Sequence, residues 1–423
     1  MKSKSLQELA DSISASAKTL TDYLTSNNLA QPTFEVGAPQ AWPELPLDVM
    51  KARSELCDAS KLMNILGQGN RTYLTWMVYS QADYGALQWL SHFNIADHIP
   101  LDKVISYADV AKCANVDEAH LRRLARNAIA NNIFCEPRPG HLAHNSVSTL
   151  LRSEEQFRDL IAFILEDNLP WTAKLSSAYE RWGKEMGSRM NMTAVNVAED
   201  MEEDVFSWMA RDQELMTRFA GMMRAHMETE GHGVELFVKG FDWEGVGGGT
   251  VVDVGGGFGH ISITLAKEFP KLSFVVQDLP SVIPEAEVQC PADVKDRVSF
   301  QVHDFWHENP VKDAEIYILK SVLHDWNDVD STKLIKNILP AMKPGVSKLL
   351  IVDGVVPDPG TCSLHDEKPL RTMDILMMIN CGAVERETDG WKRLVEGVDD
   401  RLKVKNIIRP PGALNSVIEV TFS

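Results

Sequence analysis

The chain has 423 residues and a formal net charge of −18, with 44% hydrophobic, 24% charged and 8% aromatic residues. This length and composition are those of a globular protein of two or three domains, and they exclude a disulfide-stapled miniprotein, wholesale disorder and fibrous repeats. The acidic excess disfavours general binding to nucleic acid or to an anionic membrane surface, because both carry negative charge.

The cysteines are scattered and form no CxxC pair and no metal-ligand spacing. The N-terminal segment lacks the apolar core of a secretory signal, and no stretch approaches the roughly 20 apolar residues that span a bilayer. We therefore expect free thiols, no metal, no membrane contact and a cytoplasmic location. The six cysteines are Cys57, Cys113, Cys135, Cys290, Cys362 and Cys381.

The first 150 residues favour helices and a small winged helix. Residues 1 to about 80 are expected to be helical except for the proline-rich segment 31–46, which cannot continue a helix. Residues 82–150 predict two helices that meet at a turn, then a strand and a wing, with a possible reader helix at about 117–131. Over 117–152 the basic residues exceed the acidic ones by only about two charges. Packing or dimerisation is therefore preferred to DNA binding, and a ligand-sensing transcription regulator is the rival from another class.

Residues 155–241 are expected to be mostly helical and include a methionine-rich run next to several tryptophans. Methionine fills irregular apolar space, so these residues suit either an ordinary core or a pocket for a flat apolar substrate, and both readings stay open. The methionines of this run are Met201, Met209, Met216, Met222, Met223 and Met227.

After the glycine-rich segment 240–249, short apolar runs alternate with helical segments. The runs at 250–254, 272–279, 314–323 and 348–356 have the rhythm of βαβ units around a buried parallel sheet. The sequence thus predicts an α/β protein with a C-terminal, Rossmann-like, doubly wound domain at 186–423 and a helical and winged-helix domain at 1–185.

A glycine motif follows the first predicted strand and precedes a helix. Asp253, Gly255, Gly257 and Gly259 form the pattern DxGxGxG, in which glycines let the backbone approach a ligand closely. A dinucleotide fingerprint would need glycine at position 260, which is His260. The observed spacing resembles the pattern of S-adenosylmethionine-dependent methyltransferases, in which the loop faces the methionine part of the cofactor.

Acidic and aromatic residues follow the next predicted strands. Asp278 is placed to accept hydrogen bonds from ribose hydroxyls, although it could simply cap the turn before Pro280. Asp304 and Phe305 could meet an adenine ring. A further cluster ends the following strand, at the carboxyl edge where open α/β sheets bind ligands: Lys320, His324, Asp325 and Trp326.

These motifs resemble, in order and spacing, the plant and fungal small-molecule O-methyltransferases of the caffeate type. The resemblance covers about 240–423 motif by motif, and the winged-helix segment 82–150 agrees with the N-terminal dimerisation domain of that family. The motifs that carry it are DVGGGFGHISITLAKEFPKLSFVVQDLP, VHDFW, LKSVLHDWND, KLLIVDGVVPD and MDILMMINCGAVERETDGWKRLVEG.

The resemblance implies a role for each matching residue. His324 would be the general base, oriented and polarised by Glu385 and Asp353; Asp353 stands where the family usually has glutamate, and its shorter side chain would reach less far. Cofactor-binding positions would be Asp253, Gly255, Gly257, Asp278, Leu279, Asp304, Phe305, Lys320 and Trp326. The acceptor would meet Met223, Met377, Asn380 and Asp325.

The sequence therefore predicts a homodimeric, metal-independent O-methyltransferase. It would transfer a methyl group from S-adenosylmethionine to a hydroxyl of an aromatic or polyketide-like secondary metabolite. The rival within the same fold is an enzyme repurposed for pericyclic, hydroxylation or decarboxylation chemistry. Retention of His324 and of both acids argues against that rival, because a repurposed site has no need of an aligned base.

Overall fold

The computed structural model describes residues 4–423, and the chain forms two compact units. Unit 1 comprises Met1–Ala173, Phe206–Glu228 and Ser363–His365, and unit 2 comprises Lys174–Val205, Thr229–Cys362 and Asp366–Ser423. Residues 1–3, at the start of the predicted segment 1–185, lie outside the described residues. The division into functional domains at residue 185 stays a prediction.

Unit 1 begins with helices α1 (Leu6–Ser26), α2 (Leu47–Gln68), α3 (Asn70–Tyr79) and α4 (Gln81–His92). The proline-rich segment between α1 and α2 is not helical, as expected. Its backbone is held by α7 (Ser146–Ser153): the Ser146 N–H donates to the Phe34 carbonyl at 2.9 Å.

The winged-helix arrangement predicted for residues 82–150 is present. Strands β1 (Ile105–Ser106), β2 (Cys135–Arg138) and β3 (His141–Ala143) form an antiparallel sheet in the order β1-β3-β2, next to α5 (Tyr107–Ala114) and α6 (Glu118–Ala130). On α6, the candidate reader helix, Arg126 pairs with Glu136 and Arg122 pairs with Glu118. Acids of the same unit thus offset part of the positive charge that a DNA-reading helix would need.

The methionine run divides between two environments. Met201 and Met209 are buried, whereas Met216 and Met223 are more than one-third exposed. The first two therefore act as core filler, and the last two lie at the surface of α13 (Gln213–Glu228). The other helical segments of this region are α8 (Glu155–Ala162), a π-helical turn (Phe163–Asn168), α9 (Leu169–Thr172), α10 (Leu175–Trp182), α11 (Ala194–Ala198) and α12 (Val205–Met209).

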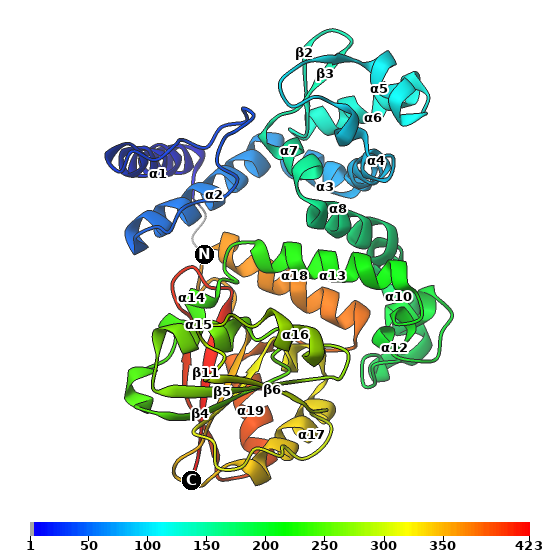
Figure 1. The fold of residues 1–423 in the computed structure, drawn as a ribbon. Coiled ribbons are helices and arrows are strands. Elements are labelled where there is room, and N and C mark those ends of the chain that lie inside the picture. Colours follow the sequence, from blue (N-terminus) through cyan, green and yellow to red (C-terminus); the bar gives the residue numbers. More distant parts are fainter. Residues whose placement is uncertain (1–3) are drawn as a thin grey trace. The chain divides into compact units, whose positions relative to one another are not determined.

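Unit 2 is built on an eight-stranded sheet with the order β10-β11-β8-β7-β4-β5-β6, to which β9 adds by pairing with β8 (Figure 1). The pairs among β4, β5, β6, β7 and β8 are parallel, whereas β10 and β11 form an antiparallel hairpin on β8. The parallel strands lie where the sequence predicted them. The bounds are β4 (Gly249–Val254), β5 (Leu272–Asp278), β6 (Val298–Val302), β7 (Ile316–Lys320), β8 (Lys348–Val356), β9 (Arg386–Glu387), β10 (Leu402–Ile408) and β11 (Asn415–Phe422).

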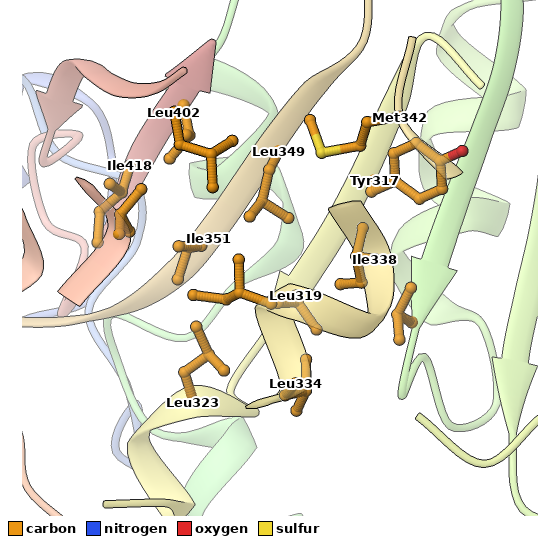
Figure 2. Packing of buried hydrophobic residues seen from close by; sticks show 14 of the residues in the cluster. Tyr317, Leu319, Leu323, Leu334, Ile338, Met342, Leu349, Ile351, Leu402 and Ile418 are labelled. Atoms are coloured by element: carbon orange, nitrogen blue, oxygen red, sulfur yellow. The ribbon is translucent and has the colours of Figure 1, made fainter. Parts of the chain in front are cut away.

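Helices cover both faces of this sheet, which confirms the doubly wound fold. Alternate strand residues point to opposite faces. Leu319 and Ile351 pack with Leu334 of α17 (Figure 2), and the same cluster includes Trp391 of α19. The neighbouring strand residues Ile318 and Leu350 pack in a second cluster with α14 and α15. The helices of this unit are α14 (Val234–Lys239), α15 (His260–Glu268), α16 (Ile283–Gln289), α17 (Asp328–Ile338), α18 (Leu364–Asn380, which starts in unit 1) and α19 (Thr388–Val398).

The core fixes the ends of the strands. Tyr317 is fully buried in β7 and donates its hydroxyl proton to the carbonyl of Val311 or Ala341, at 2.7 and 2.8 Å. Because β4, β5, β7 and β8 are parallel, their carboxyl ends meet at one edge, and the predicted site residues follow those ends.

Within residues 4–423, no helix is both long and apolar enough to cross a membrane.

Candidate active site

The glycine motif forms an open cradle between β4 and α15. Gly255, Gly257 and Gly259 have φ values of +72°, +55° and +72°, a region that residues with a side chain rarely adopt. A Cβ at Gly257 would meet nothing within 4 Å, so the backbone here is open to a ligand. At Gly255 a Cβ would lie 3.1 Å from Val322 and 3.9 Å from Phe305, which places Phe305 beside the cradle.

Asp278 ends β5 and faces this cradle. Its Oδ2 accepts a hydrogen bond from the Gly257 N–H at 2.8 Å, and its Oδ1 accepts one from the Leu279 N–H at 2.7 Å. These bonds fix the carboxylate against the glycine loop and leave it further lone pairs for hydroxyl donors. The cradle and this carboxylate fit the nucleoside of S-adenosylmethionine.

An aromatic cluster lies beside the cradle. The Phe305 and Trp326 rings meet edge to face with centroids 6.1 Å apart, and Trp306 packs on Trp326 at 4.6 Å. Asp304 accepts a hydrogen bond from the Trp306 N–H at 3.0 Å, which fixes its carboxylate next to Phe305. Asp304 and Phe305, the residues predicted to contact adenine, thus lie beside the cradle, and their role in binding adenine stays a prediction.

Asp253, near the end of β4, and Lys320, at the end of β7, interact electrostatically. Asp253 is 2% exposed and accepts a hydrogen bond from Ser262 at 2.8 Å, and burial raises the pKa of its carboxyl group to about 6. Burial lowers the pKa of Lys320, which the charges of Asp253 and Asp353 oppose. Lys320 therefore interacts both with an acid of the glycine motif and with an acid near His324.

His324 lies on a short turn directly after β7. Ser321 adopts φ +51°, unusual for a residue with a side chain, and donates its N–H to the Val352 carbonyl at 3.0 Å. The chain then enters the 3-10 helix η5 (Leu323–Asp325), which carries His324. The strained turn thus directs the imidazole back to the carboxyl edge of the sheet.

Glu385 is the direct partner of His324. The His324 Nδ1 and the Glu385 Oε1 are 2.9 Å apart, and the Glu385 side chain is 2% exposed. Asp374 of α18 accepts a hydrogen bond from the Glu385 N–H at 3.0 Å. A carboxylate on Nδ1 selects the tautomer that carries a proton there, so that Nε2 is free to accept a proton.

Asp353 acts on His324 through its charge, and no hydrogen bond joins the two. Asp353 is 1% exposed, and within the described part of the chain neither of its carboxylate oxygens has a hydrogen-bond partner. Burial raises the pKa of this carboxyl group to about 7, against the effect of the His324 charge. A side chain shorter than glutamate at this place agrees with that arrangement.

The acids around His324 outweigh the cost of burying its charge. Burial lowers its pKa, but Asp325, Glu385 and Asp353 together raise it to about 10. The Asp325 Oδ1 lies 3.6 Å from His324 Nε2, on the side opposite Glu385. The imidazolium form is therefore strongly stabilised in the site without ligands.

The predicted acceptor residues come from different parts of the fold. Met377 and Asn380 lie on the unit 2 part of α18, Asp325 follows His324, and Met223 belongs to α13 of unit 1. The neighbouring Met378 lines a cavity of about 610 Å³ with Leu175, Tyr179 and Met186. Among residues 4–423, no group of three or more histidine, cysteine and acidic side chains is arranged to hold a metal ion.

Three residues that support this site were missed in the sequence. Arg386 was passed over beside Glu385 in the same motif, Asp374 lies in the MDILMM segment, and Gly354 directly follows Asp353. A Cβ at Gly354 would lie 2.5 Å from Glu385 Oε2. A glycine inside a predicted buried strand was the available signal, because it marks a close approach.

Comparisons with known proteins agree with this geometry. An O-methyltransferase domain matches residues 188–398. The O-methyltransferase aoiF of Aspergillus oryzae is 34% identical over 99% of this chain and 100% of its own. The chain belongs to the O-methyltransferase family. The enzyme uses S-adenosylmethionine as its methyl donor.

Two further relatives extend the comparison. The chlorophenol O-methyltransferase of Trichoderma longibrachiatum is 34% identical to the enzyme over 98% of this chain and 89% of its own. The crystal structure of OxaC superposes with a TM-score of 0.79 at 19% identity and covers 99% of both chains, a likeness of fold. The relatives at 34% identity favour methyl transfer over a repurposed chemistry.

Asp278→Ala is expected to weaken binding of S-adenosylmethionine by about 2–4 kcal/mol, roughly 30- to 700-fold in Kd, because charge-assisted hydrogen bonds are lost. Titration calorimetry measures this change. Asp293→Ala, which removes an exposed carboxylate 4.0 Å from Lys267, is the control and should bind like the parent. Parental affinity in Asp278→Ala would show that Asp278 only caps its turn.

Gly354→Ala is expected to displace Glu385, because the new methyl would lie 2.5 Å from Oε2 of a buried, hydrogen-bonded carboxylate. We expect kcat to fall about 10- to 100-fold with little change in cofactor affinity. Gly397→Ala, where a Cβ meets nothing within 4 Å, is the control. Full activity of Gly354→Ala would show that Glu385 need not be fixed there.

Proposed function

We propose that the enzyme methylates a phenolic hydroxyl of an aromatic or polyketide-like secondary metabolite, with His324 as the general base. The pairing of His324 Nδ1 with the buried Glu385 Oε1, beside the glycine cradle, carries this proposal. The name of the chlorophenol-methylating relative supports a phenolic acceptor.

The cofactor supplies a methyl group bound to a positively charged sulfur. The protein's own part is to hold the acceptor oxygen in line with that methyl and to take the proton from the oxygen. Positioning alone accounts for several kcal/mol of rate acceleration in such a displacement. The residues proposed to hold the cofactor are the glycine cradle, Asp278, Phe305 and Trp326.

His324 is matched to a phenol as a proton acceptor. A phenol has a pKa of about 10, and the surrounding acids raise the pKa of His324 to about 10 as well. Neutral imidazole with phenol and imidazolium with phenolate hold the same total number of protons. Because the two pKa values match, the proton can move from the phenol to the imidazole at little cost in free energy. Asp325, Glu385 and Asp353 then stabilise the imidazolium as the oxygen attacks.

A second copy of the chain is the proposed partner. Helix α3 has no buried residue, and its apolar side chains are about 60% exposed. Contiguous apolar surface of this kind marks an interface. We propose that α3 and the winged-helix segment together form the surface through which two copies of the chain make a homodimer. The exposed residues are Leu74, Trp76, Met77, Val78 and Tyr79.

We place the enzyme in the cytoplasm. Cys113 is an exposed free thiol, and Cys135, Cys290 and Cys381 are also free. Unpaired cysteines of this kind are usual in a reducing compartment, which supports the proposal.

Phenols and naphthols incubated with the enzyme and methyl-labelled S-adenosylmethionine should gain one labelled methyl group on oxygen, detected by mass spectrometry. His324→Ala should lower this rate 10²–10⁴-fold and leave the Kd of the cofactor within a few-fold, because the base faces the acceptor. His365→Ala, on the unit 1 part of α18, is the control. Retained activity in His324→Ala would contradict the general-base assignment.

The pH profile gives a second readout of the same pair. Since a protonated imidazole cannot accept a proton, kcat should rise with pH from neutral into the alkaline range. The rising part of this profile is its acid limb. Glu385 raises the pKa of His324, so Glu385→Gln should move the acid limb to lower pH while lowering the maximal rate. Initial rates from pH 6 to 10 measure the limb, and an unchanged limb in the variant would refute the pairing.

Trp76→Asp combined with Val78→Asp should convert a dimer to monomers, because charge is placed in the proposed apolar interface. Light scattering gives the mass, and calorimetry checks that cofactor binding persists. Val329→Asp, at a 74% exposed valine of α17, is the matched control. A dimer of unchanged mass in the double variant would exclude α3 from the interface.

A further inference from the structure

Arg386 is a buried cation directly after Glu385 in the chain. Its side chain is 3% exposed, and its backbone begins β9, which pairs with β8 at Val355. A buried charge is costly unless hydrogen bonds satisfy its donors. The five N–H groups of a guanidinium form a rigid planar fork, and the partners of this fork define what Arg386 holds.

The guanidinium of Arg386 donates hydrogen bonds to the backbone of the segment that carries His324. Nη1 donates to the Leu323 carbonyl at 2.9 Å, and Nη2 donates to the Trp326 carbonyl at 2.8 Å. These two carbonyls bracket His324 and Asp325. The Leu323 carbonyl also accepts the Trp326 N–H of the 3-10 turn at 3.3 Å, so Arg386 adds a charged donor to it and a second one to the Trp326 carbonyl.

Three further contacts fix the guanidinium itself. Nη2 donates to Ser331 Oγ at 3.1 Å, and Nε donates to Asp328 Oδ1 at 2.8 Å, both on α17. The guanidinium carbon lies 5.0 Å from the centre of the Trp391 ring. Strand β9, helix α17 and helix α19 thus meet at one side chain.

We propose that Arg386 is a positioning residue that holds the His324 turn opposite Glu385. The inference rests on the proposed role of His324. Two adjacent residues of the chain hold His324: Glu385 contacts the imidazole at Nδ1, and Arg386 donates to the backbone carbonyls before and after it. The contacts form a closed ring from Glu385 through His324 and its turn to Arg386, so the position of the guanidinium helps to set the distance between His324 Nδ1 and Glu385 Oε1.

A purely structural role for Arg386 makes a different prediction. Loss of a merely structural contact lowers the melting temperature and leaves the pKa of His324 unchanged in the folded protein. Loss of positioning separates the imidazole from Glu385. The pKa of His324 then falls toward 6.5, since Glu385 contributes to raising it.

Arg386→Lys is the first test, because lysine keeps the charge and loses the planar fork. In the full-length variant we expect kcat to fall about 10- to 100-fold, the acid limb of the pH profile to move to lower pH, and the Kd of S-adenosylmethionine to stay within a few-fold. The control is Arg297→Lys, since Arg297 also donates to a backbone carbonyl, that of Ala266, away from His324. If Arg386→Lys shows the same acid limb and the same kcat as the Arg297→Lys control, the proposal is overturned.

Two additional measurements keep the outcome decisive. If Arg386→Lys does not fold, Asp328→Ala, which removes the carboxylate that fixes Nε of the guanidinium, should shift the acid limb in the same direction by less. An unshifted acid limb would overturn the proposal. The NMR titration of His324 without cofactor or acceptor is independent of turnover. A lowered His324 pKa in a variant supports the positioning role even if methyl transfer to phenols is not found, and an unchanged value refutes it.

Discussion

The buried hydrogen bond between His324 Nδ1 and Glu385 Oε1 is the contact on which the proposed site depends. Each partner comes from a different loop, so the bond exists only if both loops are held. The positive φ of Ser321 marks the turn of the chain after β7, and Arg386 holds the carbonyls on either side of His324 and Asp325. On the other side, the small Gly354 leaves room for Glu385.

Charge and burial oppose each other at this bond. Burial disfavours an imidazolium, yet three nearby carboxyl groups reverse the effect and raise the pKa of His324 to about 10. Burial also raises the pKa of Asp353 to about 7, so this acid contributes its full charge only above neutral pH. A base of this strength suits a phenol, and a much weaker acid such as an alkyl alcohol would be a poor match.

Much of the fold could be read from the sequence, for physical reasons that particular residues illustrate. The apolar run around Tyr317 is buried on both faces, so its strand was evident, and the glycines at 255, 257 and 259 marked the cradle. The π-helical turn at Phe163–Asn168 and the β10–β11 hairpin were not foreseen, because local patterns do not record tertiary packing. Arg386 escaped notice for a similar reason: its partners on the His324 turn and on α17 lie 55 to 63 residues away in the chain.

The pKa of His324 in the resting enzyme tests the central claim most directly. Protein labelled with ¹³C and ¹⁵N at histidine, with His324 assigned by comparison with His324→Gln, can be titrated by NMR without cofactor or acceptor. We predict a pKa well above the ordinary value of about 6.5, with the Nδ1 proton retained when the ring becomes neutral. A pKa at or below 6.5, or a neutral ring protonated at Nε2, would contradict a base held by Glu385 and the surrounding acids.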